Sequence, residues 1–346
     1  MKNIIKSIDY NALKNNILNI KADLHNTKLC AVIKSNAYGH GLNKIAKAIE
    51  NYVDYFAVID NKEAINLRKI TKKHIIVLGS CNFDNLITAI QQNVEISVDN
   101  ITQLKMIEII AKNLKKTISI HLQLDTGLHR LGISNKKDIF RMLAIIKQNK
   151  YLNLSSVYSH LGDGANKSRT RAQIAQFNDL TSCITKTIFH LFNTQYWRQV
   201  NYLGMVRIGA GVYGYGHPKT TPVLSIQARI IKIQKIKKDE YIGYGSNHKA
   251  PKDMSVAILS IGYADGLPYA WAQSGWVLYK DKKCPFVADI CMNMSIIEAS
   301  PQMKVNDYVT ILGKDNQSYI FANDIASHSH TIVDEVLTRF GVLSTD

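Results

Sequence analysis

The sequence is poor in cysteine, the residue that would support a disulfide framework or a zinc site. Only five of its 346 residues are cysteine, and they are widely spaced and never form a Cys-x-x-Cys pair. An odd number of scattered cysteines argues against a disulfide framework, and the missing pairs argue against the common zinc motifs. We therefore expect free thiols in a reducing compartment and no bound metal.

Long apolar runs are also missing. Charged residues interrupt every apolar stretch before it reaches the roughly 18 to 20 residues that a membrane-spanning helix needs. The N-terminal segment MKNIIKSIDY contains too short an apolar stretch for a signal peptide. These absences predict a cytoplasmic protein without a membrane partner.

Acidic residues are scarce relative to basic ones, with 27 Asp and Glu against 43 Lys and Arg and a formal net charge of +16. Such an excess can indicate nucleic-acid binding, because clustered Lys and Arg neutralise phosphates. Here the basic residues are spread out, and short runs such as 235–238 and 280–283 are interrupted by other residues. No nucleic-acid-reading motif accompanies them, so we expect a solvated basic surface and no nucleic-acid partner.

Short apolar, β-branched runs alternate with stretches of helical periodicity through the first two thirds of the chain. Eight strand-then-helix repeats predict a (β/α)8 barrel of the TIM type. An open doubly wound sheet is the alternative, but it would place a Gly-rich phosphate-binding sequence after an early strand, and the chain has none. The eight runs are residues 29–34, 55–60, 75–80, 94–99, 118–125, 154–160, 189–194 and 206–211.

The pattern changes after residue 222. Strand-like runs without long helices follow, separated by turn residues, and the longest of them are 223–236 and 287–298. This pattern predicts a second, mostly β domain. We therefore divide the chain into a barrel domain, residues 1–222, and a mostly β C-terminal domain, residues 223–346, which the first residues of the chain can join.

Polar residues lie where the predicted barrel strands end, which is where active sites of this architecture gather. They are Lys34 for the first run, Asp125 and Thr126 for the fifth, His160 for the sixth, Asn193 and Thr194 for the seventh, and Arg207 within the eighth. A lysine in such a position can form a Schiff base with pyridoxal phosphate. That cofactor serves as an electron sink for a carbanion at the α-carbon of an amino acid.

Several segments together resemble the alanine racemase family of pyridoxal-phosphate enzymes. The segment AVIKSNAYGHG, residues 31–41, has the form in which that family carries its cofactor lysine. The segment IGYADG, residues 261–266, follows in the same order as in the family. The resemblance covers nearly the whole chain and includes IDYNALKNNI at 8–17, QLDTGLHRLG at 123–132, MVRIGAGVYG at 205–214 and ICMNMSIIE at 290–298.

The resemblance implies two proton-transfer groups on opposite faces of the cofactor. Lys34 would carry pyridoxal phosphate and exchange the α-proton together with Tyr263, because a racemase removes this proton from one face and returns it to the other. His160 and Arg207 would support Tyr263 as a base. Arg207 would also meet the pyridine nitrogen. Since arginine donates a hydrogen bond without giving up a proton, this contact favours racemisation over transamination.

The resemblance also implies how the cofactor phosphate is held. Tyr38, Thr194 and the backbone amides around Gly209 and Ala210 would bind it, since small residues let the backbone approach an anion. Asn193, beside Thr194 at the end of the seventh run, belongs to the same cofactor-binding group. We therefore expect the phosphate near the ends of the first, seventh and eighth strands.

Substrate recognition is the third implication. Arg130 would lie near the cofactor's phenolic oxygen and bind the substrate carboxylate, a task that suits a bidentate guanidinium. Met292 and Tyr263 would enter the active site from a second subunit, because the family forms a head-to-tail homodimer. The expected partners are thus a small amino acid and a second copy of the chain.

Three positions depart from the family pattern. Gln123 stands where many members have a lysine modified by carbon dioxide, Asn293 replaces an Asp, and Asp334 replaces a tyrosine that touches the phosphate and narrows the substrate gate. A carboxylate beside a phosphate dianion is repulsive unless it turns away or is protonated. These changes affect alanine specificity more than they affect the racemase assignment.

The sequence leaves four hypotheses for function. The first is an alanine racemase that supplies D-alanine for a bacterial cell wall. The second is a racemase of broader specificity, for serine or larger amino acids. The third is a cofactor-binding or nucleic-acid-associated relative without catalysis, and the fourth is a barrel decarboxylase with the same cofactor, which would not need Tyr263 as a base. The motifs favour the first.

Overall fold

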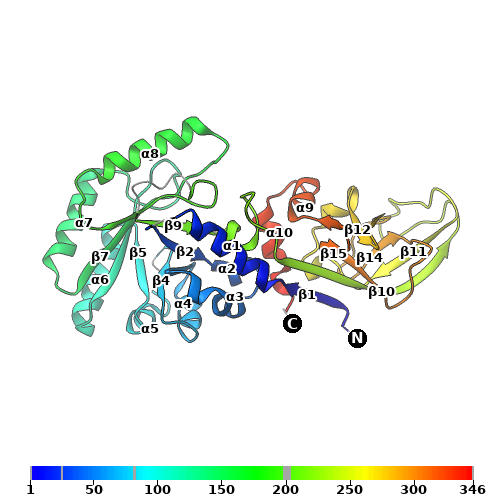
Figure 1. Ribbon diagram of the computed structural model, residues 1–346, viewed down its shortest axis with the longest axis horizontal. Helices are drawn as coiled ribbons and strands as arrows, with labels where there is room; N and C mark the ends of the chain where they lie inside the picture. Colours follow the sequence, from blue (N-terminus) through cyan, green and yellow to red (C-terminus); the bar gives the residue numbers. More distant parts are fainter. Residues whose placement is uncertain (1, 25, 81–82, 198–203, 345–346) are drawn as a thin grey trace. The chain divides into compact units, whose positions relative to one another are not determined.

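The structure is a computed structural model that describes residues 2–24, 26–80, 83–197 and 204–344. The chain forms two compact units, whose elements are labelled in Figure 1. What we call the barrel unit contains Lys14–Ser35 and Leu42–Thr220. The β unit contains Met1–Leu13, Asn36–Gly41 and Thr221–Asp346. The predicted domain boundary after residue 222 remains a prediction.

One parallel sheet of eight strands forms the barrel unit, in the order β8-β7-β6-β5-β4-β3-β2-β9. Its two ends meet, because the backbone N–H of Arg207 in β9 donates to the carbonyl of Phe192, just after β8, at 3.1 Å. The predicted (β/α)8 barrel is therefore confirmed. Its strands are β2 (Lys28–Val32), β3 (Tyr55–Val58), β4 (His74–Val77), β5 (Glu95–Val98), β6 (Ile118–Gln123), β7 (Leu152–Tyr158), β8 (Ile188–His190) and β9 (Met205–Ile208).

One helix precedes the first barrel strand and the others follow strands, and Figure 1 shows α6, α7 and α8 along the outside of the sheet. They are α1 (Tyr10–Ala22), α2 (Lys34–Tyr38), α3 (Leu42–Ile49), α4 (Asn61–Arg68), α5 (Leu86–Gln91), α6 (Ile101–Leu114), α7 (Lys136–Gln148) and α8 (Lys167–Thr181). Four of these helices begin at an Asp or Asn whose side chain accepts a hydrogen bond from the third helical amide. These capping residues are Asp60, Asn100, Asn135 and Asn166. The caps fix where each helix begins after its strand.

The β unit is built on a second sheet of eight strands, which is antiparallel. The long central strand β10 alternates buried and partly buried residues along its first half, as expected for a strand with one face on a core. The N-terminal strand β1 pairs with β10 across more than two hundred residues. The elements are β1 (Ile4–Ile8), β10 (Leu224–Ile236), β11 (Met254–Leu259), β12 (Trp276–Tyr279), β13 (Lys282–Pro285), β14 (Ser295–Glu298), β15 (Tyr308–Asp315), β16 (Ser318–Ile320), α9 (Ala322–His328) and α10 (Val333–Arg339).

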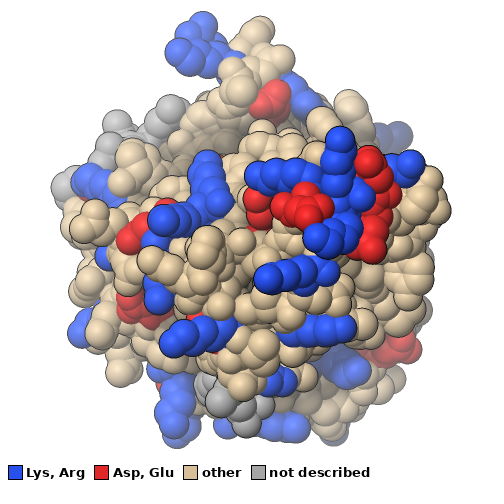
Figure 2. All heavy atoms as spheres, turned by 90° about the vertical axis from the view of Figure 1, so that its right-hand side faces the viewer, with Lys and Arg blue, Asp and Glu red and all other residues tan. Residues whose placement is uncertain are grey.

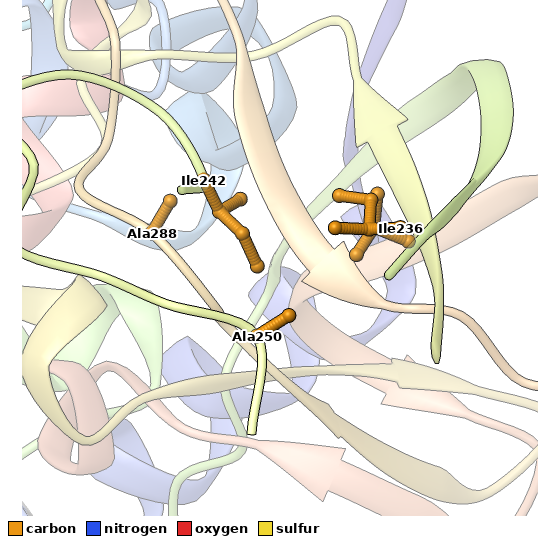
Figure 3. Close-up of a cluster of buried hydrophobic side chains, with 5 residues drawn as sticks. Ile236, Ile242, Ala250 and Ala288 are labelled. Carbon is orange, nitrogen blue, oxygen red and sulfur yellow. The ribbon is translucent and has the colours of Figure 1, made fainter. Parts of the chain in front are cut away.

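A hydrophobic cluster holds the loop between β10 and β11 in place. Ile236, Ile242, Ala250, Val256 and Ala288 are all buried in it (Figure 3). Backbone hydrogen bonds also cross the loop, since the N–H of Ile242 donates to the carbonyl of His248 and the N–H of Ala250 to that of Glu240, both at 2.9 Å. Burial of these apolar side chains therefore helps to hold the loop. It stabilises the packed arrangement by about 25 cal/mol per Å² of apolar surface removed from water.

Basic and acidic side chains are interspersed on the face of the molecule shown in Figure 2. Ion pairs of the β unit include Lys237 with Asp253 at 2.7 Å and Lys252 with Glu298 at 3.9 Å. Exposed pairs of this kind contribute little to stability, roughly 0 to 1 kcal/mol each. On this face, the mixing of signs is the arrangement of a solvated charged surface.

Four cysteines lie in the described ranges, Cys30, Cys183, Cys284 and Cys291, and all are free thiols. Cys81 lies outside the described residues. In the part of the chain that the structure describes, no group of three or more His, Cys, Asp or Glu side chains is arranged to hold a metal ion. No helix in those same ranges combines the length and the apolar composition that a membrane crossing requires.

Candidate active site

Lys34 begins a single turn of unusual handedness directly after β2. The residues from Ser35 to Tyr38 all have φ between 52° and 55°, which makes α2 a left-handed turn. For residues other than glycine this conformation costs about 1–2 kcal/mol each. Such strain persists only where the surrounding structure enforces it, and it is common at functional sites.

Contacts within the β unit enforce the second half of this turn. Nδ1 of His40 lies 3.0 Å from the carbonyls of both Ala37 and Tyr38, and since carbonyls only accept, Nδ1 carries the proton. Burial lowers the pKa of His40 to about 4, so the ring is neutral. At Gly39, with φ +80°, a Cβ atom would lie 2.6 Å from the carbonyl oxygen of Leu337. Only glycine fits there.

The guanidinium of Arg207 lies inside the barrel, and the residue is only 4% exposed. Its Nη1 lies 2.5 Å from Nδ1 of His190 and 3.0 Å from the carbonyl oxygen of the same residue. Its Nη2 donates to the carbonyl of Ser159 at 2.7 Å and lies 3.4 Å from Nδ1 of His160. Both terminal nitrogens of Arg207 are therefore directed at acceptors of the barrel unit.

Tyr158 supports Arg207 from one side. The guanidinium lies over the Tyr158 ring, 5.0 Å from its centroid, and the same ring stacks on His190 at 4.8 Å. The Tyr158 hydroxyl donates to Oε1 of Gln123 at 2.9 Å. Gln123 is buried and Arg130 is exposed. At this departure from the family pattern, the chain therefore uses a neutral amide to hold Tyr158.

His160 lies within reach of three positive charges. Burial, followed by the charges of Arg207, Arg130 and Lys34 in that order, lowers its pKa to about 3. Its Nδ1 faces an N–H of Arg207, which can only donate, so we place the proton of the neutral ring on Nε2. Lys34, His160 and Arg207, predicted from the ends of three strands, thus share one electrostatic environment with Arg130, which the family resemblance indicated. This environment suits an anionic ligand.

Small residues and a hydroxyl lie together after β8 and β9. Oγ1 of Thr194 accepts a hydrogen bond from the backbone N–H of Gly211 at 3.2 Å. A Cβ atom at Gly211 would lie 2.9 Å from Cγ2 of Thr194, so the backbone there approaches the threonine closely. Gly209 and Ala210 begin the short 3₁₀ turn that contains Gly211. Oδ1 of the neighbouring Asn193 accepts from the amide two residues on and so shapes this loop.

Tyr263 and Met292 lie together on the β unit. The backbone N–H of Tyr263 donates to the carbonyl of Cys291 at 3.1 Å. The N–H of the next residue, Ala264, donates to the carbonyl of Met292 at 2.9 Å. A Cβ atom at Gly262 would lie 2.2 Å from the Cys291 oxygen and 2.3 Å from the Met292 oxygen, so this close approach requires glycine. Tyr263 and Met292 are exposed residues, at 41% and 57%.

Tyr38 belongs to the β unit, and so does Asp334. Burial raises the pKa of the Tyr38 hydroxyl, and the negative charge of Asp334 raises it further. Asp334 is one of the three departures from the family pattern. Its charge thus acts on Tyr38, the residue that the resemblance assigns to the cofactor phosphate. How Tyr38, Tyr263 and Met292 are arranged around Lys34 stays a prediction.

Sequence reasoning missed the polar interior of the barrel. Glu95, His121, Ser156 and His190 are buried on four strands and are hydrogen-bonded in a row. The available signal was a polar or charged residue inside a short strand that is otherwise apolar. Such residues are rarely buried unless they are paired.

The fold and this site together define a class of protein. A barrel with a lysine at the end of its first strand, a buried arginine and a cluster of positive charges is an enzyme scaffold suited to an anionic cofactor. Two family comparisons match the chain, one to "Alanine racemase, N-terminal domain" over residues 8–217 and one to "Alanine racemase, C-terminal domain" over residues 223–343. The chain belongs to the alanine racemase family.

Curated relatives agree over nearly the full length. The chain is 34% identical over 328 residues to an alanine racemase of Fusobacterium nucleatum, covering 89% of this chain and 90% of the relative. It is 32% identical over 343 residues to an alanine racemase of Vesicomyosocius okutanii, covering 96% and 95%. These matches extend the family assignment across both units.

Solved structures give the same result for the fold. An alanine racemase from Bacillus anthracis with bound L-Ala-P superposes with a TM-score of 0.90 at 26% identity, covering 98% of this chain and 93% of that one. One from Bartonella henselae with covalently bound pyridoxal phosphate has a TM-score of 0.90 at 24% identity, covering 98% of both chains. At 24% identity, the likeness to the Bartonella henselae structure supports the fold alone.

Proposed function

We propose that the chain interconverts L- and D-alanine with pyridoxal phosphate attached to Nζ of Lys34. The observation that carries this proposal is that Lys34, Arg130, His160 and Arg207 share one electrostatic environment in a member of the alanine racemase family. Family members supply D-alanine for the bacterial cell wall. The free thiols of the described cysteines support a reducing, cytoplasmic location.

The residues of the barrel unit fit the cofactor. Lys34 offers an amine for covalent attachment, and the Thr194 loop offers a hydroxyl and amides to a phosphate. When bound, pyridoxal phosphate serves as an electron sink that makes the α-hydrogen of an amino acid acidic. The positive charges around His160 match the negative charges of a phosphate and a substrate carboxylate.

Arg207 would hold the ring nitrogen of the cofactor. Its terminal nitrogens are directed at His190, Ser159 and His160, so the Nε–H is the donor that we assign to the ring nitrogen. An arginine holds its proton at any physiological pH. Arg207 would therefore orient the ring without protonating it, which favours racemisation over transamination.

The two proton-transfer groups would be Nζ of Lys34 and Oη of Tyr263. They must lie on opposite faces of the substrate α-carbon, so that one removes the proton while the other returns it. Arg130 would bind the substrate carboxylate, and Met292 would line the entrance. Tyr263 needs hydrogen-bond donors to act as a base, and the N–H that we place on Nε2 of His160 is suited to this task.

We infer that Tyr263 and Met292 serve a second copy of the chain in a homodimer. Both are exposed on the β unit, as are two further large apolar side chains, Tyr269 at 50% and Met294 at 44%. The rings of Tyr263 and Tyr269 pack edge to face at 6.5 Å. Exposed apolar side chains gathered in this way mark a protein contact. A symmetric dimer would cover both copies of the surface at once.

A racemase of broader specificity is the second candidate. The effect of the Asp334 charge on Tyr38 favours it. The family resemblance would place a tyrosine at this position that narrows the substrate gate. Asn293, beside Met292, is a further change at the same entrance. A comparison of turnover for the enantiomers of alanine, serine and lysine tests the choice. Faster turnover of alanine supports the first candidate, and preference for serine or lysine overturns it.

A further inference from the structure

A chain of hydrogen bonds crosses the barrel interior from Arg207. Nη1 of Arg207 lies 2.5 Å from Nδ1 of His190, and Nε2 of His190 lies 2.7 Å from Oγ of Ser156. The same hydroxyl lies 2.5 Å from Nδ1 of His121, whose Nε2 lies 2.7 Å from Oε2 of Glu95. The five residues come from the five neighbouring strands β9, β8, β7, β6 and β5. None is more than 6% exposed.

The two ends of this chain fix its direction. A guanidinium has only donors, and an ionised carboxylate has only acceptors. Each neutral imidazole and the hydroxyl between them donates one hydrogen bond and accepts one along the chain. When both rings are neutral, all four hydrogen bonds run from Arg207 to Glu95, which places the ring proton of both His190 and His121 on Nε2. Reversal would set an N–H of His190 against an N–H of Arg207.

The titration behaviour of the groups agrees with this direction. Burial by itself raises the pKa of the Glu95 carboxyl, but hydrogen bonds from His121 and His74 outweigh it and lower the pKa to about 2. Burial, and after it the charge of Arg207, hold the pKa of His190 well below its usual value. At neutral pH Glu95 is ionised and His190 is neutral, as the chain requires.

We propose that Glu95 is a positioning residue for Arg207. Its carboxylate sets the direction of the chain, so that Nδ1 of His190 always presents a lone pair to Nη1. The guanidinium is then held with its Nε–H directed to the cofactor ring. This inference rests on the proposed function, because the orientation of Arg207 matters only when it holds that ring.

Glu95 also supplies the negative charge at the end of the chain. The partners of the Arg207 guanidinium among the described residues are neutral carbonyls, imidazoles and an aromatic ring. A buried charge without compensation is costly. Each hydrogen bond in a directed chain polarises the next, so a carboxylate at the far end strengthens the acceptor that His190 offers.

His74 provides a matched control. It hydrogen-bonds to the other carboxylate oxygen of Glu95, and its side chain is 61% exposed at the end of the chain that is remote from Arg207. Removing His74 leaves all four hydrogen bonds from Glu95 to Arg207 in place. A general disturbance of this part of the barrel would respond to His74→Ala, whereas the directed chain would not.

The first measurement is ¹⁵N NMR of the full chain with labelled histidine, recorded with and without added pyridoxal phosphate. The proposal expects neutral rings with the proton on Nε2 for both His121 and His190 at neutral pH. A proton on Nδ1 of His190, or a charged His190, overturns it. This readout does not depend on activity.

The second measurement is the affinity for pyridoxal phosphate, with the absorption spectrum of the bound cofactor, in two variants of Glu95. Glu95→Leu removes the acceptor, so the cofactor should bind roughly 10-fold more weakly or worse and kcat should fall. Glu95→Gln keeps one oxygen for His121 and should remain within about threefold of the wild type. The proposal is overturned if a folded Glu95→Leu protein binds pyridoxal phosphate as tightly as the wild type and keeps the wild-type histidine tautomers.

A smaller change protects the test against misfolding. Ser156→Ala removes one hydroxyl, breaks the chain between the two histidines and should weaken cofactor binding in the same way as Glu95→Leu. Wild-type affinity in Ser156→Ala also overturns the proposal. If the wild type itself fails to racemise alanine, the proposed function fails. If the wild type racemises alanine and both variants behave like it, only the role of Glu95 fails.

Discussion

The ammonium group of Lys6 donates a hydrogen bond to the carbonyl of Gly39 at 2.6 Å. It also donates to the carbonyls of Phe340 at 2.8 Å and Leu343 at 2.9 Å, and the residue is only 2% exposed. A lysine of the first strand thus ties the turn that follows Lys34 to the C-terminal end of the chain. Burial of this charge is tolerated because three carbonyls share it.

Replacement of Lys6 tests this tie. Lys6→Met keeps the length of the side chain but leaves three buried carbonyls without their donor, at about 1–3 kcal/mol for each unsatisfied group. We expect the free energy of unfolding in urea to fall by about 3 kcal/mol or more. Lys105→Met removes an exposed charge and serves as the control. Equal stability of the two variants would contradict the role of Lys6.

Gly39 and Gly127 form a matched pair for testing the turn. Both have positive φ, +80° and +97°, so alanine is strained at either site. At Gly39 a Cβ atom would lie 2.6 Å from a backbone carbonyl, whereas at Gly127 the nearest atom lies 3.9 Å away. Gly39→Ala should lose about 2 kcal/mol more stability than Gly127→Ala and should also bind pyridoxal phosphate more weakly. Thermal unfolding and cofactor titration measure both effects.

If two subunits share each active site, as we propose, inactive variants should complement one another. Lys34→Ala and Tyr263→Phe should each be nearly inactive. In a mixed dimer one of the two sites combines an intact Lys34 with an intact Tyr263, so random mixing should restore about a quarter of wild-type activity. Each variant unfolded and refolded alone is the control. No recovery after mixing and refolding, with dimers present, would show that both groups come from one chain.

Acid stability should depend on Glu95. Its pKa lies at about 2 in the folded chain against a usual value of 4.5, so below pH 4.5 the unfolded chain binds a proton that the folded chain does not. The stabilisation from Glu95 is therefore full above pH 4.5 and is lost as the pH falls towards 2, at up to about 1.4 kcal/mol per pH unit. Urea unfolding of the wild type and Glu95→Gln between pH 6 and pH 3 measures it. Parallel curves would contradict the assignment.

Asp334 should weaken cofactor binding through its charge. Its carboxylate raises the pKa of Tyr38 in addition to the effect of burial, and it would repel a phosphate held by that tyrosine. Asp334→Asn should bind pyridoxal phosphate about 3- to 10-fold more tightly, as expected for one like charge in a partly solvated site. Glu335→Gln, which removes a neighbouring acid paired with Arg339, is the control. Unchanged affinity in Asp334→Asn would place the phosphate elsewhere.

The barrel could be predicted because its strands are buried on both faces and read as continuous apolar runs. The β unit gave a weaker signal. The predicted run 287–298 is a strand only at Ser295–Glu298, because the chain bends back at Cys291, whose amide donates to the carbonyl of Met294 at 2.9 Å. The start of the helix Lys167–Thr181 could not be placed from apolar spacing either, because the side chain of Asn166 caps it.

Three features lay beyond sequence patterns for physical reasons. The pairing of β1 with β10 depends on contacts between the two ends of the chain. The left-handed turn after Lys34 runs against the local preference of four residues that are not glycine and is enforced by packing. The row of polar groups from Glu95 to Arg207 exists only once the barrel closes.

Incubation of the full chain and pyridoxal phosphate with L-alanine in deuterium oxide tests the proposed racemisation most directly. Two bases on opposite faces predict that D-alanine appears with deuterium at the α-carbon while the optical rotation falls to zero. Lys34→Ala should show neither change. Unaltered L-alanine without deuterium, in a protein shown to hold the cofactor on Lys34, would contradict the proposed function.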